Sequence, residues 1–182
     1  MVSQLSRIDN LISPVSKRHF PKLVQGVMQV FSCPHRHFFA NMMAQALQAA
    51  GQGTSVLVVQ FLKGGINQGP DHPTQLAQNL TWLRCDVPHS ILTSELDVGE
   101  RAALATLWQH VQTVVAEGQY SLVILDELSL ATHLGLIPLA EVLSFLNQRP
   151  SYVDVTLSGT EMPQCLIDMA DQVTELRRSH RT

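Results

Sequence analysis

Two short, uninterrupted apolar runs constrain the fold of this chain more than any other feature. The first, Thr54 to Leu62, reads TSVLVVQFL between Gly53 and Gly64-Gly65, and the second, Tyr120 to Leu125, reads YSLVIL. Runs of this length and composition, bounded by glycine, are typical of parallel strands that are buried on both faces. They are far shorter than the roughly 20 residues of a membrane-spanning helix. We therefore expect a parallel sheet covered by helices, and no membrane span.

The rest of the chain alternates between helical and strand patterns. Apolar residues at helical spacing, or helix-start and helix-stop residues, predict helices over Phe38–Ala50, Glu95–Glu117, Pro138–Asn147 and Cys165–Ala170. Further strands are predicted over Val27–Phe31, Leu80–Val87, Val153–Leu157 and Val173–Leu176, and a short helical turn over Gln75–Leu80. This alternation predicts an α/β fold with a mostly parallel central sheet flanked by helices.

Length and composition indicate one globular domain. The chain has 182 residues, of which 45% are hydrophobic and 15% charged, so it can bury a sizeable core. We place the domain at residues 23–182. Residues 1–22 mix Ser, Pro and basic residues, and Pro14 and Pro21 interrupt any helix there. We interpret them as an arm that docks on the body or on a second subunit, or alternatively as a tail without fixed contacts.

The charge balance indicates which kinds of partner the protein can bind, and the cysteines indicate its cellular compartment. A net charge of −3 and a pI of about 6.2 leave no basic footprint for nucleic acid or for an anionic membrane. No signal-peptide pattern begins the chain. The three cysteines are scattered without C-x-x-C spacing, which favours reduced thiols. We predict a cytoplasmic protein with no nucleic-acid partner.

The junction between the first strand and the first helix has the layout of a phosphate-binding loop without its residues. Such loops read G-x-x-x-x-G-K-[ST], where glycines let backbone N–H groups surround the phosphates, Lys reaches them and a hydroxyl holds Mg²⁺. In that register Cys33 takes the first Gly, Phe38 the Lys and Phe39 the hydroxyl. The Cβ atoms of Cys33, Pro34 and His37 also obstruct the backbone conformations that glycine allows. The altered nucleotide loop comprises Ser32, Cys33, Pro34, His35, Arg36, His37, Phe38 and Phe39.

Two other interpretations of this loop stay open. A metal could be held by Cys33, His35 and His37, with a fourth ligand recruited from His72 or His89. The simpler interpretation leaves both loop histidines solvated.

The two aromatic residues of the loop also have two interpretations. Phe38 and Phe39 could fill the volume of an absent nucleotide as core residues. Together with Met42 and Met43 they could instead form a contact surface for a partner. The helical spacing favours core packing.

Carboxylates and polar residues follow two of the predicted strands. Asp126 and Glu127 come directly after the YSLVIL run, which is the pattern of a Walker B strand whose acids hold Mg²⁺ or orient water. They are the best candidates for catalysis and for a magnesium site. Ligands of open α/β sheets bind beyond such strand ends. Gln60, Lys63 and Gly64, at the end of the TSVLVVQFL run, are therefore predicted to line a strand-end cleft.

The chain resembles the ATP:cob(I)alamin (corrinoid) adenosyltransferases of the P-loop type. The matching segments, in the family's order, are ALQAAGQG (46–53), VLVVQFLKGG (56–65), LVILDEL (122–128), LNQRP (146–150) and ADQVTEL (170–176). The resemblance implies a P-loop NTPase-like (RecA-like) three-layer sandwich, a homodimer, and Mg-ATP and a corrinoid as ligands if the family's activity is retained.

The resemblance is poorest at the phosphate site. The family's loop reads like T-G-N-G-K-G-K-T-T and aligns without a gap to residues 32–40, SCPHRHFFA. An expected acidic residue is replaced around Gly69-Pro70, an expected Arg is Thr160, and the family's C-terminal extension is missing. We interpret the chain as a divergent homologue with a degenerate Walker A loop.

Three functions follow as hypotheses. The first is a non-catalytic pseudoenzyme that binds a protein partner or a small ligand in the strand-end cleft. The second is an active corrinoid adenosyltransferase of cobalamin metabolism with an altered mode of ATP binding. The third is a corrinoid or tetrapyrrole carrier in which His35, His37 or His72 approaches the metal centre.

Overall fold

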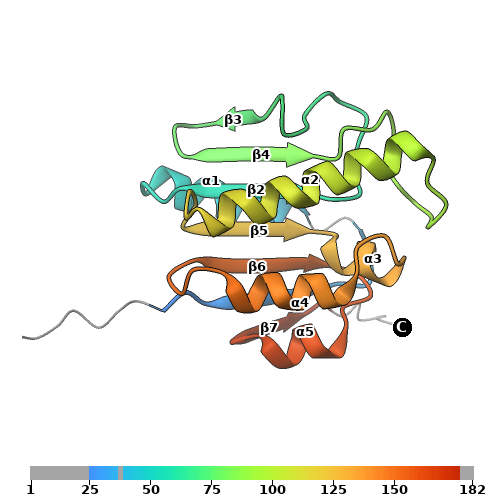
Figure 1. Cartoon of the computed structure of the whole chain (residues 1–182). Coiled ribbons are helices and arrows are strands. Elements are labelled where there is room, and N and C mark those ends of the chain that lie inside the picture. Colours follow the sequence, from blue (N-terminus) through green and yellow to red (C-terminus); the bar gives the residue numbers. More distant parts are fainter. Residues whose placement is uncertain (1–24, 37–38, 177–182) are drawn as a thin grey trace, which may run out of the picture.

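The structure, a computed structural model, describes residues 25–36 and 39–176, without the side chain of Phe39. Its strands are β1 (Met28–Ser32), β2 (Val56–Gln60), β3 (Thr74–Leu76), β4 (Leu80–Arg84), β5 (Leu122–Asp126), β6 (Asp154–Gly159) and β7 (Gln172–Glu175). Its helices are α1 (Phe39–Gly51), α2 (Val98–Ala116), α3 (Leu128–His133), α4 (Leu139–Gln148) and α5 (Gln164–Met169). The alternation of strands and helices confirms the predicted α/β class (Figure 1).

All seven strands form one sheet in the order β3-β4-β2-β5-β6-β1-β7. Every pairing is parallel except that of the edge strand β3 with β4. One strand, β6, lies between β1, which leads into the altered loop, and β5, which ends in the two acids. The parallel strands therefore bring their carboxyl ends to one edge of the sheet, at the right of Figure 1.

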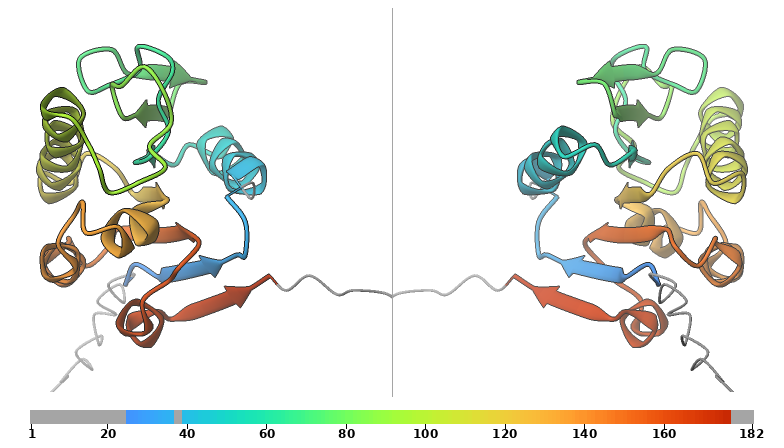
Figure 2. Two further views of the ribbon diagram at one scale, coloured as in Figure 1. Left: turned by 90° about the vertical axis from the view of Figure 1, so that its right-hand side faces the viewer. Right: turned by 90° about the vertical axis from the view of Figure 1, so that its left-hand side faces the viewer.

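Helices cover both faces of the sheet, so the fold has three layers. In Figure 2, α1 lies on one side of the sheet and α2 and α4 lie on the other. The larger hydrophobic cluster joins the sheet to α2, α3, α4 and α5, and a smaller cluster joins it to α1 through Met42, Ala46 and Ala50. This is the three-layer, P-loop NTPase-like arrangement that the resemblance implied.

Burial on both faces explains the uninterrupted apolar run of β2. Leu57 and Val59 belong to the larger cluster, whereas Val56 and Val58 belong to the smaller one. All five residues of the strand are buried. Because neither face meets water, no polar residue alternates along the strand.

The helix α2 begins three residues later than the predicted Glu95, and its buried face is the predicted one. Asp97 is the N-cap residue, and it forms a capping box with Glu100, whose side chain accepts the backbone N–H of Asp97 in return. The buried side chains are those predicted from the helical spacing, namely Leu104, Leu107, Trp108, Val111, Val114 and Val115.

Two local predictions were wrong. The expected helical turn at Gln75–Leu80 is instead the end of β3 and a turn into β4, because Ala77 adopts a left-handed φ of 56° and Gln75 pairs across the strands with Thr81. The short helix α3, which has His133 in its last turn, was not predicted. Six residues are too few for a visible helical period.

The arm predicted at residues 1–22 lies outside the described residues, as do His37 and Phe38. Among the residues that are described, no helix is long and apolar enough to cross a membrane.

Candidate functional site

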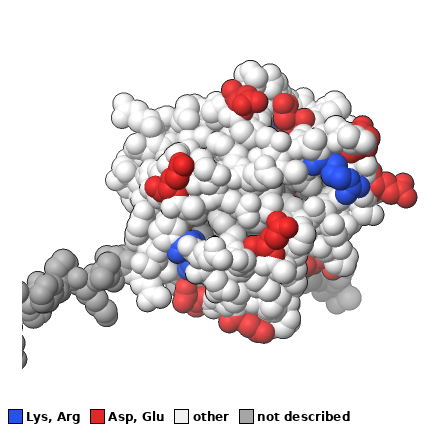
Figure 3. All heavy atoms as spheres, in the orientation of Figure 1, with Lys and Arg blue, Asp and Glu red and all other residues white. Residues whose placement is uncertain are grey.

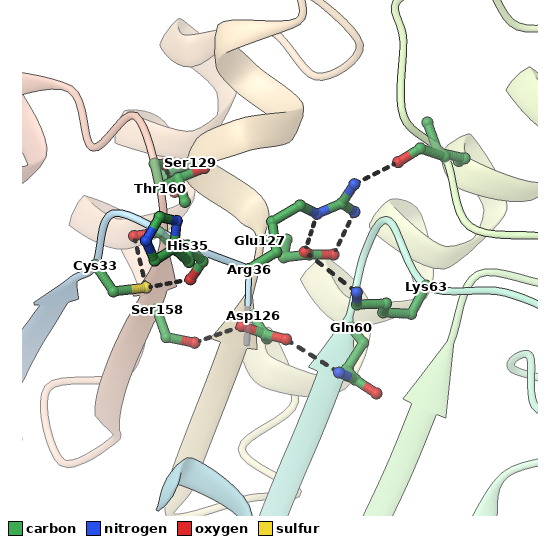
Figure 4. Close-up of polar contacts among 12 residues, drawn as sticks. Cys33, His35, Arg36, Gln60, Lys63, Asp126, Glu127, Ser129, Ser158 and Thr160 are labelled. Carbon is green, nitrogen blue, oxygen red and sulfur yellow. Dashed lines mark hydrogen bonds and ion pairs between the residues drawn. The ribbon is translucent and has the colours of Figure 1, made fainter. Parts of the chain in front are cut away.

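The candidate site lies at the carboxyl edge of the sheet, where β1, β2, β5 and β6 end side by side (Figure 4). Asp126 is the last residue of β5, and Glu127 follows as the residue before α3. The backbone N–H of Glu127 donates to the carbonyl of Ser158 on β6 at 2.8 Å. The fold therefore fixes both acids at the edge where ligands of α/β proteins bind.

Asp126 is a buried carboxylate, 5% exposed, with two neutral hydrogen-bond donors. Gln60 Nε2 donates to its Oδ2 at 3.0 Å, and Ser158 Oγ donates to its Oδ1 at 2.8 Å. Burial raises the pKa of Asp126 to about 6, although the two hydrogen bonds favour the charged form.

The hydrogen bonds of Asp126 continue across the neighbouring strands. Arg84 Nε donates to Gln60 Oε1 at 2.9 Å, and the Arg84 guanidinium lies 4.7 Å from the ring centroid of Trp82. Ser158, Asp126, Gln60 and Arg84 are register partners on β6, β5, β2 and β4. Their side chains thus form one continuous polar row along the carboxyl edge, which we call the transverse row.

Glu127 is the most tightly bound side chain of the site. Its carboxylate, 2% exposed, pairs with Arg36, whose Nε lies against Oε1 and whose Nη2 donates to Oε2 at 2.9 Å. Lys63 Nζ lies 3.7 Å from Oε1. Hydrogen bonding to Glu127 raises the pKa of Arg36. The two basic residues therefore neutralise the buried carboxylate.

Arg36 also connects the altered loop to a second loop. Its Nη1 donates to the carbonyl of Ile91 at 3.1 Å, in the segment between β4 and α2. One guanidinium thus bridges three separate segments: the loop after β1, the start of α3 and the loop before α2.

In this arrangement the carboxylate oxygens of Asp126 and Glu127 are poorly placed to serve as ligands of a Mg²⁺ ion. Both oxygens of Glu127 already accept from Arg36, and both oxygens of Asp126 accept from Gln60 and Ser158. A magnesium ion requires several oxygen ligands in octahedral geometry. A Mg²⁺ ion would have to compete with Arg36 and Lys63 for the carboxylate of Glu127.

Within the described part of the altered loop, Cys33 points into the protein. Cys33 is buried: its backbone N–H donates to the Gly159 carbonyl at 3.1 Å, and its Sγ lies 3.1 Å from the carbonyl of His35. Burial raises the pKa of the thiol. Pro34 and the His35 side chain are exposed. The thiol thus contacts the backbone carbonyl of His35.

No group of three or more metal-ligating side chains occurs within residues 25–36 and 39–176. The Cys33-His35-His37 hypothesis still depends on His37, which lies outside the described residues. Of its two proposed fourth ligands, His72 is exposed, and His89 Nε2 lies 2.9 Å from Glu100 Oε1.

Residues 33–36, the part of the altered loop that the structure describes after β1, avoid the backbone conformations that favour glycine. Non-glycine residues with positive φ, in the described part of the chain, are Ala77, Glu127 and Glu161. Residues 33–36 are not among them. The left-handed residue of the site is instead Glu127, with φ of 63°, a conformation that costs roughly 1–2 kcal/mol for a non-glycine residue.

The three residues predicted to line a strand-end cleft have different surroundings. Gln60 is 2% exposed and belongs to the transverse row, whereas Lys63 reaches Glu127. Gly64 packs against the carbonyls of Val87 and His89, where an added Cβ would overlap both oxygens. The cleft itself stays a prediction.

Sequence reasoning missed four contributors to the site: Arg36 as a partner of Glu127, the Ile91 carbonyl, Arg84 and Ser158. The strand-end positions of Arg84 and Ser158 were a usable signal, because parallel strands that end together place such residues in one row. The Ile91 carbonyl had no signal in the sequence.

The strand order, with one strand between the loop strand and the acid-bearing strand, defines a P-loop NTPase-like α/β protein. Comparison with protein families agrees at a finer level: the family described as ATP:corrinoid adenosyltransferase BtuR/CobO/CobP matches residues 26–182. The chain therefore belongs to the corrinoid adenosyltransferase family.

Individual relatives are similar over most of the chain. The corrinoid adenosyltransferase CobA of Salmonella typhimurium is 29% identical over 161 residues, covering 84% of this chain and 77% of the relative. The corrinoid adenosyltransferase of Escherichia coli K12 is 28% identical over the same shares of the two chains. That of Pseudomonas aeruginosa is 27% identical over 162 residues, covering 84% and 75%.

Proposed function

We propose that this protein is a non-catalytic member of the corrinoid adenosyltransferase family, which acts by binding a protein partner or a small ligand at the carboxyl edge of its sheet. One observation carries the proposal: Arg36, from the loop that would hold the phosphates, pairs through two nitrogens with the acid that would serve the metal, Glu127. Arg36 of the loop and the acid Glu127 are therefore hydrogen-bond and charge partners of each other.

The sequence of the loop supports the same conclusion. A Lys, a hydroxyl and several glycines of the family's pattern are replaced, with Phe38 and Phe39 in the places of the Lys and the hydroxyl. A charge-assisted hydrogen bond contributes on the order of 1.5–3 kcal/mol. Losing several such contacts together would lower the affinity for a triphosphate by orders of magnitude. We therefore regard the Walker A loop as degenerate.

Exposed apolar side chains near this edge favour a protein partner over a small ligand. Leu92, which follows the Ile91 that Arg36 contacts, is 72% exposed, and Val98 at the start of α2 is 88% exposed. Ile66, in the loop after β2, is 49% exposed. A contiguous patch formed by these side chains would be typical of a protein-interaction site, whereas single exposed apolar side chains are normal on any surface. A homodimer, as the family resemblance implies, is one form that such a partner could take.

Active adenosyl transfer is the second candidate. Membership of the family and the placement of Asp126 and Glu127 at the end of β5 favour it. In that case Arg36 would have to leave Glu127 when Mg-ATP binds, and the reduced corrinoid would be the substrate.

An adenosylation assay distinguishes the two candidates. The protein is incubated with Mg-ATP and chemically reduced cobalamin, and adenosylcobalamin is followed by its absorbance, with the Escherichia coli relative as the positive control. We expect no product above the protein-free rate. Catalytic turnover would overturn the proposal. A change in the cobalamin spectrum without ATP would instead support the carrier hypothesis.

A further inference from the structure

A hollow lies between two loops at the carboxyl edge of the sheet. One loop follows β2 and begins with residues of the candidate site, and the other follows β4. The hollow has a volume of about 270 Å³ and is lined by Gly65, Ile66, Asn67, Asp86, Val87 and Pro88. Its lining thus combines three apolar side chains with one carboxylate and one amide.

The two loops pack backbone against backbone, which fixes the walls of the hollow. The Ile91 N–H donates to the Leu62 carbonyl at 2.9 Å, and the Gly65 N–H donates to the Val87 carbonyl at 2.8 Å. Between these two bonds lies Gly64, where an added Cβ would overlap the carbonyl oxygens of the facing loop. The close approach at Gly64 therefore holds the two loops together along the length of the hollow.

Asp86 supplies the charge of the hollow. It is exposed, and its carboxylate has no hydrogen-bond or ion-pair partner among residues 25–36 and 39–176. The side chain lies against Gly69, where an added Cβ would come within 2.9 Å of the Asp86 Cβ. The exposed amide of Asn67 is equally without a partner in the described chain. A carboxylate beside apolar walls suits a basic side chain, because the alkyl stem covers the walls while the charged head reaches the carboxylate.

The surface around the hollow is acidic. Residues 25–176 contain five Lys or Arg residues and fourteen Asp or Glu residues. Four of the five basic side chains make contacts within the protein, namely Arg36, Lys63, Arg84 and Arg149. In Figure 3, acidic side chains are visible at the upper right, where Figure 1 places the two loops and the start of α2. A partner that carries positive charge is therefore attracted to this end of the molecule.

An exposed apolar side chain lies on the same surface. Leu92 is 72% exposed, although the preceding residue, Ile91, is buried and bonded through its N–H and its carbonyl. Leu92 is four residues beyond Pro88, so the two lie within about 14 Å of each other along the chain. The fold thus presents a fixed apolar contact at a short distance from the acidic hollow.

We propose that the hollow binds a basic side chain of a partner protein, and that an apolar side chain of the same partner segment covers Leu92. Arginine is the better fit, because its planar fork presents several donors to the oxygens of Asp86 and Asn67. The proposal rests on the proposed function in one respect, that a protein partner binds at the carboxyl edge. It adds the chemistry that recognises this partner.

Nuclear magnetic resonance of the full, ¹⁵N-labelled chain tests the hollow with a defined probe. The protein is titrated with N-acetyl-arginine methylamide and, separately, with N-acetyl-citrulline methylamide, which has nearly the same shape but no charge. We expect the arginine probe to shift the amide signals of Gly65, Ile66, Asn67, Asp86 and Val87 in a saturable manner. Equal shifts with citrulline, or no saturable shift at these amides, would overturn the proposal.

A matched pair of variants makes this test specific. Asp86→Asn removes the carboxylate of the hollow, whereas Glu95→Gln removes an exposed carboxylate that does not line it. We expect Asp86→Asn to abolish the shifts caused by the arginine probe and Glu95→Gln to retain them. The dispersion of the amide signals shows that both variants are folded. Equal binding by the two variants would mean that Asp86 does not recognise the probe, and would overturn the proposal.

A pair of peptides tests the contact with Leu92. Acetylated and amidated Arg-Ser-Gly-Ser-Leu places a leucine four residues from the arginine, and Arg-Ser-Gly-Ser-Ser lacks it. We expect the leucine peptide to bind several-fold more tightly, because its leucine buries apolar surface, and Leu92→Ser to remove this gain without weakening the serine peptide. Equal affinities of the two peptides for the wild type would contradict the role of Leu92.

These titrations can fail independently of the proposed function. Adenosylcobalamin formation together with binding of the arginine probe would overturn the non-catalytic role and leave the docking site intact. No binding of the probe, with no adenosylcobalamin formed, would overturn the docking site alone.

Discussion

Arg36 Nη2 donates to Glu127 Oε2 at 2.9 Å, and this contact joins the loop after β1 to the acid that directly follows β5. The two residues are 91 positions apart in the chain. The Glu127 side chain is 2% exposed, so its charge depends on Arg36 and on the more distant Lys63 for neutralisation. The stability of the fold therefore depends on whether Arg36 and Glu127 are paired in the candidate site.

Removal of Arg36 should destabilise the protein. We expect Arg36→Ala to lower the free energy of unfolding by about 2–3 kcal/mol, because a buried carboxylate then loses a two-pronged, charge-assisted partner. Arg36→Lys should cost less, since it retains the charge but not the two parallel hydrogen bonds. Urea unfolding gives both values. Arg101→Ala removes an exposed basic side chain that is not among the ion-pair partners of Glu127 and is the control. An equal loss of stability in this variant would contradict the expectation.

The pKa of Asp126 predicts an unusual pH dependence. Burial raises this pKa from 3.8 to about 6 in the folded protein, so the folded state holds the proton more tightly than the unfolded state between these values. The stabilising contribution of Asp126 to the free energy of unfolding is complete below about pH 4 and is lost as the pH rises through about 6. The loss is at most about 3 kcal/mol.

The variant Asp126→Asn isolates this contribution. Its amide can accept from Gln60 and donate to Ser158, whose hydroxyl serves as donor or acceptor. Stability curves of the two proteins, measured by urea unfolding from pH 4 to pH 7, are subtracted to remove the other carboxylates. We expect the wild type to lose stability relative to the variant across this range. A flat difference curve would show that Asp126 titrates normally.

The transverse row should contribute to stability through Gln60. We expect Gln60→Met to cost about 2–3 kcal/mol, because it leaves a buried oxygen of Asp126 and the Nε of Arg84 without their partner. The matched control is Gln29→Met, since Gln29 makes one exposed hydrogen bond to Gln172 on the neighbouring strand. If chemical unfolding gave the same small loss of stability for both variants, the transverse row would not contribute to stability as expected.

The thiols should differ in reactivity. Burial raises the pKa of Cys85 to about 12 and also raises that of Cys33, so neither forms appreciable thiolate at pH 8. Cys165 is partly exposed. We expect the native protein to react with a thiol reagent at Cys165 first and with all three cysteines only after unfolding. Rapid modification of Cys33 in the native protein, mapped by mass spectrometry, would mean that the loop opens readily.

The turn between β3 and β4 offers a test of backbone conformation. Ala77 has φ of 56°, which costs roughly 1–2 kcal/mol for a residue with a Cβ. We expect Ala77→Gly to be neutral or to stabilise the protein by up to about 1 kcal/mol. Ala105→Gly, on the exposed side of α2, should destabilise it by about 1 kcal/mol. Thermal melting of the two variants should therefore give shifts that differ in sign or size.

Much of the fold could be predicted because its strands are buried on both faces. The apolar runs of β2 and β5 predict buried strands, and the spacing of apolar residues in α2 predicts a helix that packs on the sheet. The hairpin at β3 could not be predicted, since Ala77 adopts a conformation that its side chain disfavours. The helix α3 is too short to show a period.

The candidate site was predictable only in part. Asp126 and Glu127 were identified because acids directly follow an apolar strand, and they lie where expected. The partner of Glu127 could not be predicted, because the contact with Arg36 joins two loops whose separation the sequence pattern does not fix. Arg36 stood in the altered loop as a basic residue without an assigned role.

Isothermal titration of the full chain with Mg-ATP, repeated with reduced cobalamin present, shows whether the carboxyl edge of the sheet binds ATP. We expect no saturable heat in either titration at micromolar to low millimolar ATP, because Arg36 holds Glu127 and the loop lacks its phosphate ligands. Saturable binding in the micromolar range would contradict the account and would make adenosyl transfer the function to pursue.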